Sequence, residues 1–228
     1  MTRATTAAAS AKGQDLFKGM TTTKQPKAPK KEPRAAIQTG EHGRYQIKSG
    51  LLAGEYVARA FPKAPTTARG LIAEAHGETE EEAIAALHAA IDARETKRNE
   101  ARREDTHTGV AVPSVEEYVE AISQVALTAP QRAMLTALSL AGEEGLSESR
   151  MARAGGYKSK ASARRSFTGA GTSMSLYLST GAEAQEGDTA EGLALLGFQE
   201  TGDGEEGTGP WVLYPELRDA VHKALRPE

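Results

Sequence analysis

Cysteine is absent from this chain of 228 residues. Its absence excludes disulfide bonds, zinc sites with Cys ligands, iron–sulfur clusters and thiol nucleophiles. Long apolar runs are absent as well: segments such as LALL at 193–196 fall far short of the ~18 residues that a membrane helix requires. The N-terminus also lacks the continuous apolar segment of a signal peptide. We therefore expect a cytoplasmic protein.

Aromatic residues are scarce, at 5% of the chain with a single Trp. The core must therefore be built mainly from Ala, Leu, Val and Ile, a composition that suits short helices. A length of 228 residues allows one large domain or two small ones. We expect two small domains and a tail, in the α+β class.

Positive charge is unevenly distributed along the chain. Residues 1–36 hold eight Lys and Arg against two acidic residues, whereas the remaining 192 residues hold 20 basic and 29 acidic ones. The segment is rich in Lys, Pro, Thr and Ala and has no periodic apolar set to bury, so residues 1–43 are predicted to be a disordered basic tail. Such a tail serves either as a solubilising linker or as an arm that attracts phosphates or an acidic partner.

Residues 44–98 form the first predicted domain. Three short strand-like runs, RYQIKS, GEYVARAFP and RGLIAEAHG, are bounded by Gly or Pro. Thr79 and Glu82 then have the spacing of a capping box. Apolar residues follow at helical intervals through about Arg94: Ala83, Ile84, Leu87 and Ile91. This β-β-β-α order resembles the small domains that bind DNA with a sheet in the major groove, such as the arm-type domain of phage integrases.

A polar segment, residues 99–112, is predicted to be a linker, and residues 113–228 form the second domain. Ser114 and Thr128 each begin a helix, a short helix starts near Ser147, and a longer one runs from about Ser159 toward Tyr177 with a possible interruption at Gly169 or Gly171. A strand-turn-strand signal at 193–215, from LALLGFQETG to PWVLYP, and a last helix follow. Helix, glycine turn, helix and hairpin together predict a mainly helical winged helix-turn-helix domain.

The segment GYKSKASARRSFTGAG at 156–171 resembles the GYKSxASAN-type module of bacterial helix-turn-helix domains that accompany HNH restriction endonucleases. The residues that fall in register with that module are Gly156, Tyr157, Lys158, Ser159, Ala161, Ser162, Ala163, Phe167 and Gly171. The sequence departs from it at Arg164, Arg165 and Ala170. The resemblance implies a module that reads DNA rather than a catalytic one.

The same region stands out by its charge. Residues 150–165 contain six basic side chains and no acidic one, in a body that is otherwise acidic. Helical spacing places Lys160 and Arg164 one turn apart, which suits a helix that meets phosphates and base edges. The alternative is a solvated basic face. The candidate DNA-binding residues are Arg150, Arg153, Tyr157, Lys158, Ser159, Lys160, Arg164 and Arg165.

Signatures of enzymes are missing. The sequence has no Walker loop, no GxSxG, no HExxH and no EF-hand pattern. The His residues are scattered among separate elements, so we expect no catalytic, cofactor-binding or metal-binding residue: His42, His76, His88, His107 and His222.

The leading hypothesis is a non-enzymatic protein that binds double-stranded DNA, regulatory or accessory to a DNA-processing nucleoprotein complex of bacterial, phage or plasmid origin. The β-β-β-α unit would supply a second DNA contact. Acidic loops at 182–191 and around Asp203, Glu205 and Glu206 argue against a DNA-binding wing. They leave open a protein-binding adaptor or inhibitor, such as a counter-defence factor, and an accessory domain of a nuclease on another chain.

Overall fold

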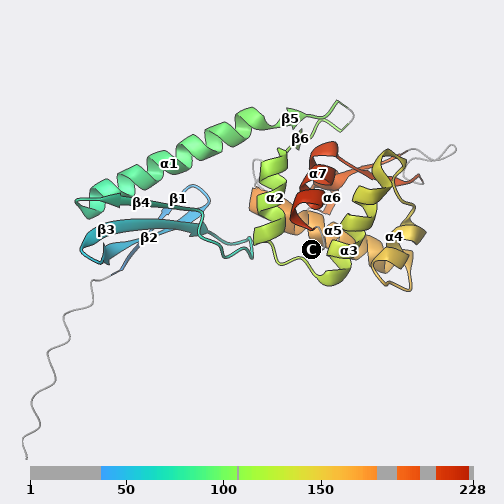
Figure 1. The fold of residues 1–228 in the computed structure, drawn as a ribbon, viewed down its shortest axis with the longest axis horizontal. Coiled ribbons are helices and arrows are strands. Elements are labelled where there is room, and N and C mark those ends of the chain that lie inside the picture. The colour runs from blue at the N-terminus through green and yellow to red at the C-terminus, as the bar shows by residue number, and fades with distance from the viewer. Residues whose placement is uncertain (1–36, 107, 179–188, 201–208, 226–228) are drawn as a thin grey trace, which may run out of the picture. The chain divides into compact units, whose positions relative to one another are not determined.

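A four-stranded antiparallel sheet begins the described part of the chain in this computed structural model (Figure 1). The structure describes residues 37–106, 108–178, 189–200 and 209–225. The strands follow one another in chain order: β1 (Gln38–His42), β2 (Tyr45–Leu52), β3 (Glu55–Pro62) and β4 (Ala73–Gly77). Most of the predicted tail, residues 1–36, lies outside the described residues.

Strand β1 corrects two predictions, the tail boundary at residue 43 and the count of three strands. Its sequence, QTGEH, has no apolar alternation and is almost entirely exposed. It pairs with β2 through the main chain, with Gln38 opposite Ser49 and His42 opposite Tyr45. An edge strand needs only these backbone hydrogen bonds, so the hydrophobic pattern could not reveal it.

Helix α1 (Glu80–Ala101) covers one face of the sheet. The predicted capping box is present, since the Thr79 side chain accepts from the backbone N–H of Glu82 and the Glu82 carboxylate accepts from that of Thr79. Its inward residues pack against alternating residues of β2 and β3, and this cluster comprises Tyr45, Ile47, Ala58, Ala60, Ala83, Leu87 and Ile91. The sheet and α1 thus share one small apolar core.

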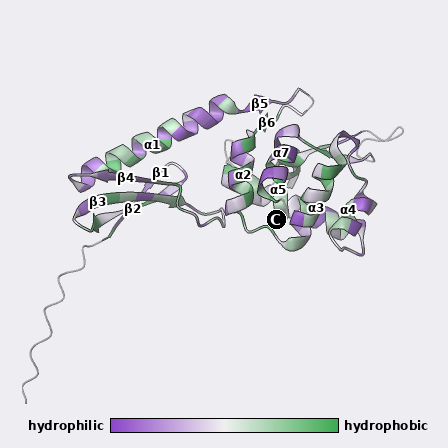
Figure 2. Cartoon of the chain, viewed as in Figure 1, coloured by the Kyte–Doolittle hydropathy of each residue, from purple (hydrophilic) through white to green (hydrophobic). Residues whose placement is uncertain are grey.

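The prediction that α1 ends near Arg94 is wrong. The helix continues to Ala101, and hydrophilic residues recur along its whole length (Figure 2). The predicted linker 99–112 contains the end of α1 and a short hairpin of β5 (Arg103–Glu104) and β6 (Ala111–Val112). The apolar periodicity of α1 ends at Ile91, because the inner face of the helix beyond that residue packs through ion pairs instead of apolar side chains.

These ion pairs join α1 to the helices that follow. Arg94 and Arg98 are four residues apart and so lie on one face of α1, and Arg102 follows directly after its last residue. Arg98 Nη2 lies 2.6 Å from Glu120 Oε2, and Arg102 Nη2 lies 2.7 Å from Glu117 Oε1. We call this group the α1–α2 ion-pair cluster; its members are Arg94, Arg98, Arg102, Glu117, Glu120 and Tyr177.

The cluster fixes the protonation of Glu120 and Tyr177. Burial alone would raise the pKa of Glu120, but the Tyr177 hydroxyl, Arg98 and Arg94 together hold that pKa below its usual value. Burial and the hydrogen bond to Glu120 raise the pKa of Tyr177. The phenol therefore remains the donor and the carboxylate the acceptor at neutral pH.

Helices dominate the rest of the chain. They are α2 (Val115–Gln124), α3 (Ala129–Ala141), the 3-10 helix η1 (Gly142–Glu144), α4 (Glu148–Ala154), α5 (Lys160–Leu178), α6 (Thr189–Leu196) and α7 (Pro215–Ala224). Strands β7 (Gly197–Gln199) and β8 (Trp211–Leu213) form an antiparallel hairpin. The predicted capping boxes at Ser114 and Thr128 are both present. The prediction of a sheet followed by helices is confirmed.

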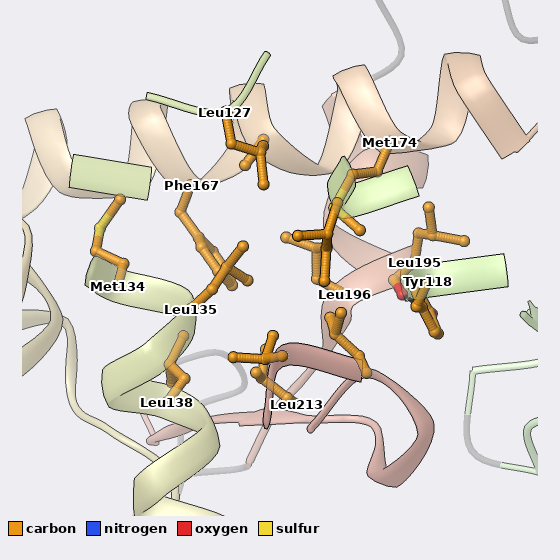
Figure 3. Packing of buried hydrophobic residues seen from close by; sticks show 14 of the residues in the cluster. Tyr118, Leu127, Met134, Leu135, Leu138, Phe167, Met174, Leu195, Leu196 and Leu213 are labelled. Carbon is orange, nitrogen blue, oxygen red and sulfur yellow. Dashed lines mark hydrogen bonds between the residues drawn. The ribbon is translucent and has the colours of Figure 1, made fainter. Parts of the chain in front are cut away.

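A second and larger apolar core lies among these helices. Figure 3 shows side chains from several elements converging on one cluster, and among them are Tyr118, Leu127, Met134, Leu135, Leu138, Phe167, Met174, Leu195, Leu196 and Leu213. Ile72, in the segment before β4, packs against both this core and the core of the sheet. The division into independently folding units at 44–98 and 113–228 stays a prediction.

No helix among the described residues combines the length and apolarity needed to cross a membrane.

We expect Arg98→Met to lower the free energy of unfolding by about 3 kcal/mol, because Glu120 then keeps only Arg94 as its guanidinium partner, while Glu95 and Glu117 also lose a nearby guanidinium. The Arg98 side chain is only 8% exposed, so water cannot replace that partner easily. Chemical denaturation followed by circular dichroism measures the change. Lys97→Met, at the exposed neighbouring position, is the control and should cost less than about 0.5 kcal/mol. Equal losses in the two variants would contradict the role assigned to the cluster.

Candidate nucleic-acid interface

A glycine turn joins α4 to α5. The Ser147 side chain accepts from the backbone N–H of Arg150 and begins α4, which ends at Gly155. Gly156 has φ +71°, a conformation that favours glycine. A Cβ at Gly155 would lie 2.9 Å from the Tyr157 ring and 3.0 Å from Met134 Cγ. The turn therefore needs both glycines to bring α5 back against α3.

Helix α5 begins at a serine cap. The backbone N–H of Ser162 donates to Ser159 Oγ at 3.2 Å, which is the bond expected of a residue that precedes a helix. No acidic residue occupies the first turn of α5. The dipole of α5 therefore favours an anion near this first turn.

One stripe of α5 is buried and orients the rest of the helix. Ala163, Phe167, Ala170 and Met174 recur every three or four residues and lie in the large core. The ring of Phe167 meets that of Trp211 edge-on, with 5.8 Å between centroids. The stripe leaves the opposite side of the N-terminal half to solvent.

Helix α5 is continuous, so the possible interruption at Gly169 or Gly171 does not occur. Gly171 instead marks the place where α5 and α6 come closest, because a Cβ there would lie 2.0 Å from the carbonyl oxygen of Gly192. A Cβ on Gly192 would likewise lie 2.6 Å from the backbone nitrogen of Thr172. Both glycines are required by close contact of two backbones.

The eight candidate residues lie along α4, the turn and the start of α5. Arg150 and Arg153 are on α4, Lys158 and Ser159 end the turn, and Lys160, Arg164 and Arg165 are on the first two turns of α5; all of these are exposed. We call the exposed cations of this group the α4–α5 basic surface: Arg150, Arg153, Lys158, Lys160, Arg164 and Arg165.

Tyr157 differs from the other candidates because it is half-buried. Its hydroxyl donates to Ser166 Oγ at 2.7 Å, and Gln131 Nε2 of α3 donates to the Ser166 carbonyl oxygen at 3.0 Å. These contacts tie the turn and α3 to the second turn of α5. Tyr157 therefore positions the helix as well as lying beside its exposed side.

Glu148 is a member of this region that the sequence reasoning missed. Its Oε1 lies 3.5 Å from Arg164 Nη1, with side-chain exposures of 24% and 53%. It stands two residues before the acid-free window of 150–165 and in the first turn of α4. The helix start at Ser147 could have indicated it, since a first-turn acidic residue is common there. An exposed pair of this kind contributes at most about 1 kcal/mol to stability.

Cations on the open face of the sheet are balanced by carboxylates. Lys48, Arg59 and Glu74 are register partners across β2, β3 and β4, so they lie on one face. Arg59 forms an ion pair with Glu74, and Lys63 forms one with Glu41. This face is therefore a weaker attractor of phosphate than the α4–α5 basic surface. The acidic residues Asp203, Glu205 and Glu206 lie outside the described residues, as do 182–188.

Two histidines that are far apart in sequence meet between β1 and α1. The rings of His42 and His88 stack with 4.0 Å between centroids, and His42 Nε2 lies 2.7 Å from Asp92 Oδ1. The scattered positions of the histidines gave no sign of this pairing. Within the described residues, no group of three or more His, Asp or Glu side chains could hold a metal ion. His107 lies outside them.

The stacked rings predict a pH-dependent stability. Burial lowers the pKa of His88, and the charge of His42 lowers it further. A depressed folded-state pKa means that the folded protein binds fewer protons than the unfolded chain. The contribution of His88 to the free energy of unfolding is therefore present above the pKa of a free His side chain, about 6.5, and is lost as the pH falls below that value. We expect His88→Gln to reduce the loss of unfolding free energy between pH 7.5 and pH 5.5 in denaturant titrations. His222→Gln, at the exposed end of α7, is the control; an unchanged pH profile in the His88 variant would disprove the assignment.

Comparison of the chain with protein-family models, with curated proteins and with solved structures gives no match. The α4–α5 basic surface and its supporting contacts are therefore the basis on which function is argued.

Proposed function

We propose that this protein binds double-stranded DNA through the α4–α5 basic surface and acts, without enzymatic activity, as a regulatory or accessory component of a bacterial, phage or plasmid nucleoprotein complex. One observation carries the proposal: six exposed cations gather on two short segments of helix and the turn between them, in a body whose net charge is negative. Concentrated positive charge of this kind attracts the phosphate backbone.

The order of elements favours a winged helix-turn-helix arrangement for residues 113–228. Helices α3, α4 and α5 are followed by the shorter helix α6 and then by the β7–β8 hairpin. Leu146, between α3 and α4, adds a short antiparallel bridge to Trp211 of β8: the Leu146 N–H donates to the Trp211 carbonyl at 3.0 Å, and the Trp211 N–H donates to the Leu146 carbonyl at 2.9 Å. In this proposal α5 is the recognition helix and the paired strands β7 and β8 belong to the wing.

The residues divide into two roles. The exposed start of α5 carries Lys160, Arg164 and Arg165, whose reach and spacing suit the major groove, where Arg binds guanine O6 and N7 with two hydrogen bonds. Arg150 and Arg153 on α4 and the uncharged cap at Ser159 suit the phosphates on either side of that groove. The buried stripe of α5 holds these side chains in one orientation.

The test is a fluorescence anisotropy titration of a mixed-sequence duplex of about 30 base pairs at 50 and 200 mM salt. Wild-type protein should bind at the lower salt and lose affinity steeply at the higher one, because bound phosphates release counterions. Absence of binding at both salt concentrations would overturn the proposal and would favour the protein-binding adaptor.

We expect Arg164→Ala with Arg165→Ala to weaken duplex binding at least about tenfold and to lower the salt slope by about one for each phosphate that the variant no longer binds. The matched control removes two exposed cations elsewhere, Arg69→Ala with Lys97→Ala. Arg94 is unsuitable as a control because it belongs to the α1–α2 ion-pair cluster. Equal affinities for the two double variants would show that bulk charge alone, and not this surface, attracts DNA.

A further inference from the structure

Arg164 differs from the other cations of the α4–α5 basic surface. Among the described residues it is the member of this surface that has a carboxylate within ion-pair distance, 3.5 Å from Glu148 Oε1. That contact joins the first turn of α4 to the second turn of α5. Lys160 stands one turn before Arg164 and Arg165 stands next to it, so Glu148 faces the part of α5 that carries the most positive charge.

An acidic side chain here opposes the function proposed for the surface. A carboxylate beside a phosphate-binding patch repels phosphate and reduces affinity for every DNA sequence equally. It also contributes little to the stability of the free protein, because more than half of the Arg164 side chain is exposed. Neither affinity nor stability therefore accounts for it.

The orientation of the Arg164 side chain does account for the presence of Glu148. A guanidinium group has five N–H donors in a planar fork, and one of its terminal nitrogens, Nη1, faces Glu148. While Nη1 faces Glu148, the Nε and Nη2 donors form the edge of the guanidinium that is open to a ligand. A freely rotating Arg takes whichever phosphate is nearest, whereas an Arg held on one side presents a fixed edge, as two hydrogen bonds to a guanine require.

We infer that Glu148 is a positioning residue for Arg164 and sets the sequence selectivity of DNA binding. The inference rests on the proposed function and deepens it. Glu148 restrains Arg164 and repels phosphate, so binding of random sequence is weakened. At a site with a guanine opposite Arg164, the oriented fork gains two hydrogen bonds, and the ion pair strengthens as water leaves the interface.

The experiment selects duplexes from a randomised library and sequences the enriched pool for wild type, Arg164→Ala, Glu148→Gln and Glu148→Asp. Base positions at which Arg164→Ala loses preference should lose it in Glu148→Gln as well, and Glu148→Asp should retain part of it. Glu148→Gln should also bind mixed-sequence duplex about threefold more tightly, while its ratio of specific to non-specific affinity falls about tenfold, the lower range for removal of one bidentate Arg–guanine pair.

Glu143→Gln is the matched control, because Glu143 lies in η1, is exposed and faces Arg218 of α7 at 3.7 Å instead of the basic surface. Its enrichment profile should equal that of wild type. Circular dichroism melting of all variants separates loss of selectivity from loss of folding, and Glu148→Asp provides a second variant should Glu148→Gln fail to fold.

The outcomes separate the two proposals. A wild-type protein that binds no duplex overturns the proposed function. A wild-type protein that binds without sequence preference, or a Glu148→Gln variant that keeps preference at the positions sensitive to Arg164, overturns the positioning role and leaves the proposed function standing.

Discussion

The buried carboxylate of Glu117 joins the start of α2 to the chain segment that leaves α1. One of its oxygens accepts from the backbone N–H of Ser114 at 3.0 Å and so completes the cap that begins α2. The other oxygen, Oε1, lies 2.7 Å from Nη2 of Arg102, the residue that caps the C-terminal end of α1. Because Glu117 is only 3% exposed, its two oxygens take their hydrogen bonds from these protein partners instead of from bulk water. One carboxylate therefore holds both the start of α2 and the residue that caps the end of α1.

Helix α5 combines two kinds of surface along its length. Its C-terminal half is buried, and Tyr177 near its end donates to Glu120 in the α1–α2 ion-pair cluster. Its N-terminal half presents Lys160, Arg164 and Arg165 to solvent. The buried half gives the exposed half a rigid support, which is what a recognition surface needs if its side chains are to reach fixed positions.

Local rules predicted the parts of the fold that depend on local interactions. The capping boxes at Ser114 and Thr128 gave the starts of α2 and α3 because the cap residue and its partner are three positions apart in sequence. Strand β1 and the last two turns of α1 were not predicted. Backbone pairing with β2 stabilises the strand, and ion pairs with distant residues stabilise the end of the helix. Such partners leave no periodic apolar pattern in the sequence.

In the candidate site, too, local features were predicted and features that depend on distant partners were not. Charge and glycine placement located the α4–α5 basic surface, because its cations are neighbours along the chain. Glu148 and the hydrogen bonds from Tyr157 and Gln131 to Ser166 depend on how three helices pack, so sequence alone could not supply them. The stacked pair of His42 and His88 likewise depends on β1, which was not foreseen.

The close contact of Gly171 with Gly192 also determines the angle at which α5 presents its charges. Two backbones that touch without intervening side chains leave neither helix room to rotate about its axis or to slide by a fraction of a turn. Gly171 stands two turns from Arg164, and about 100° of rotation separates successive residues of a helix. The placement of the basic side chains thus depends on two residues without side chains, since even a single methyl group at either one would force the two backbones apart.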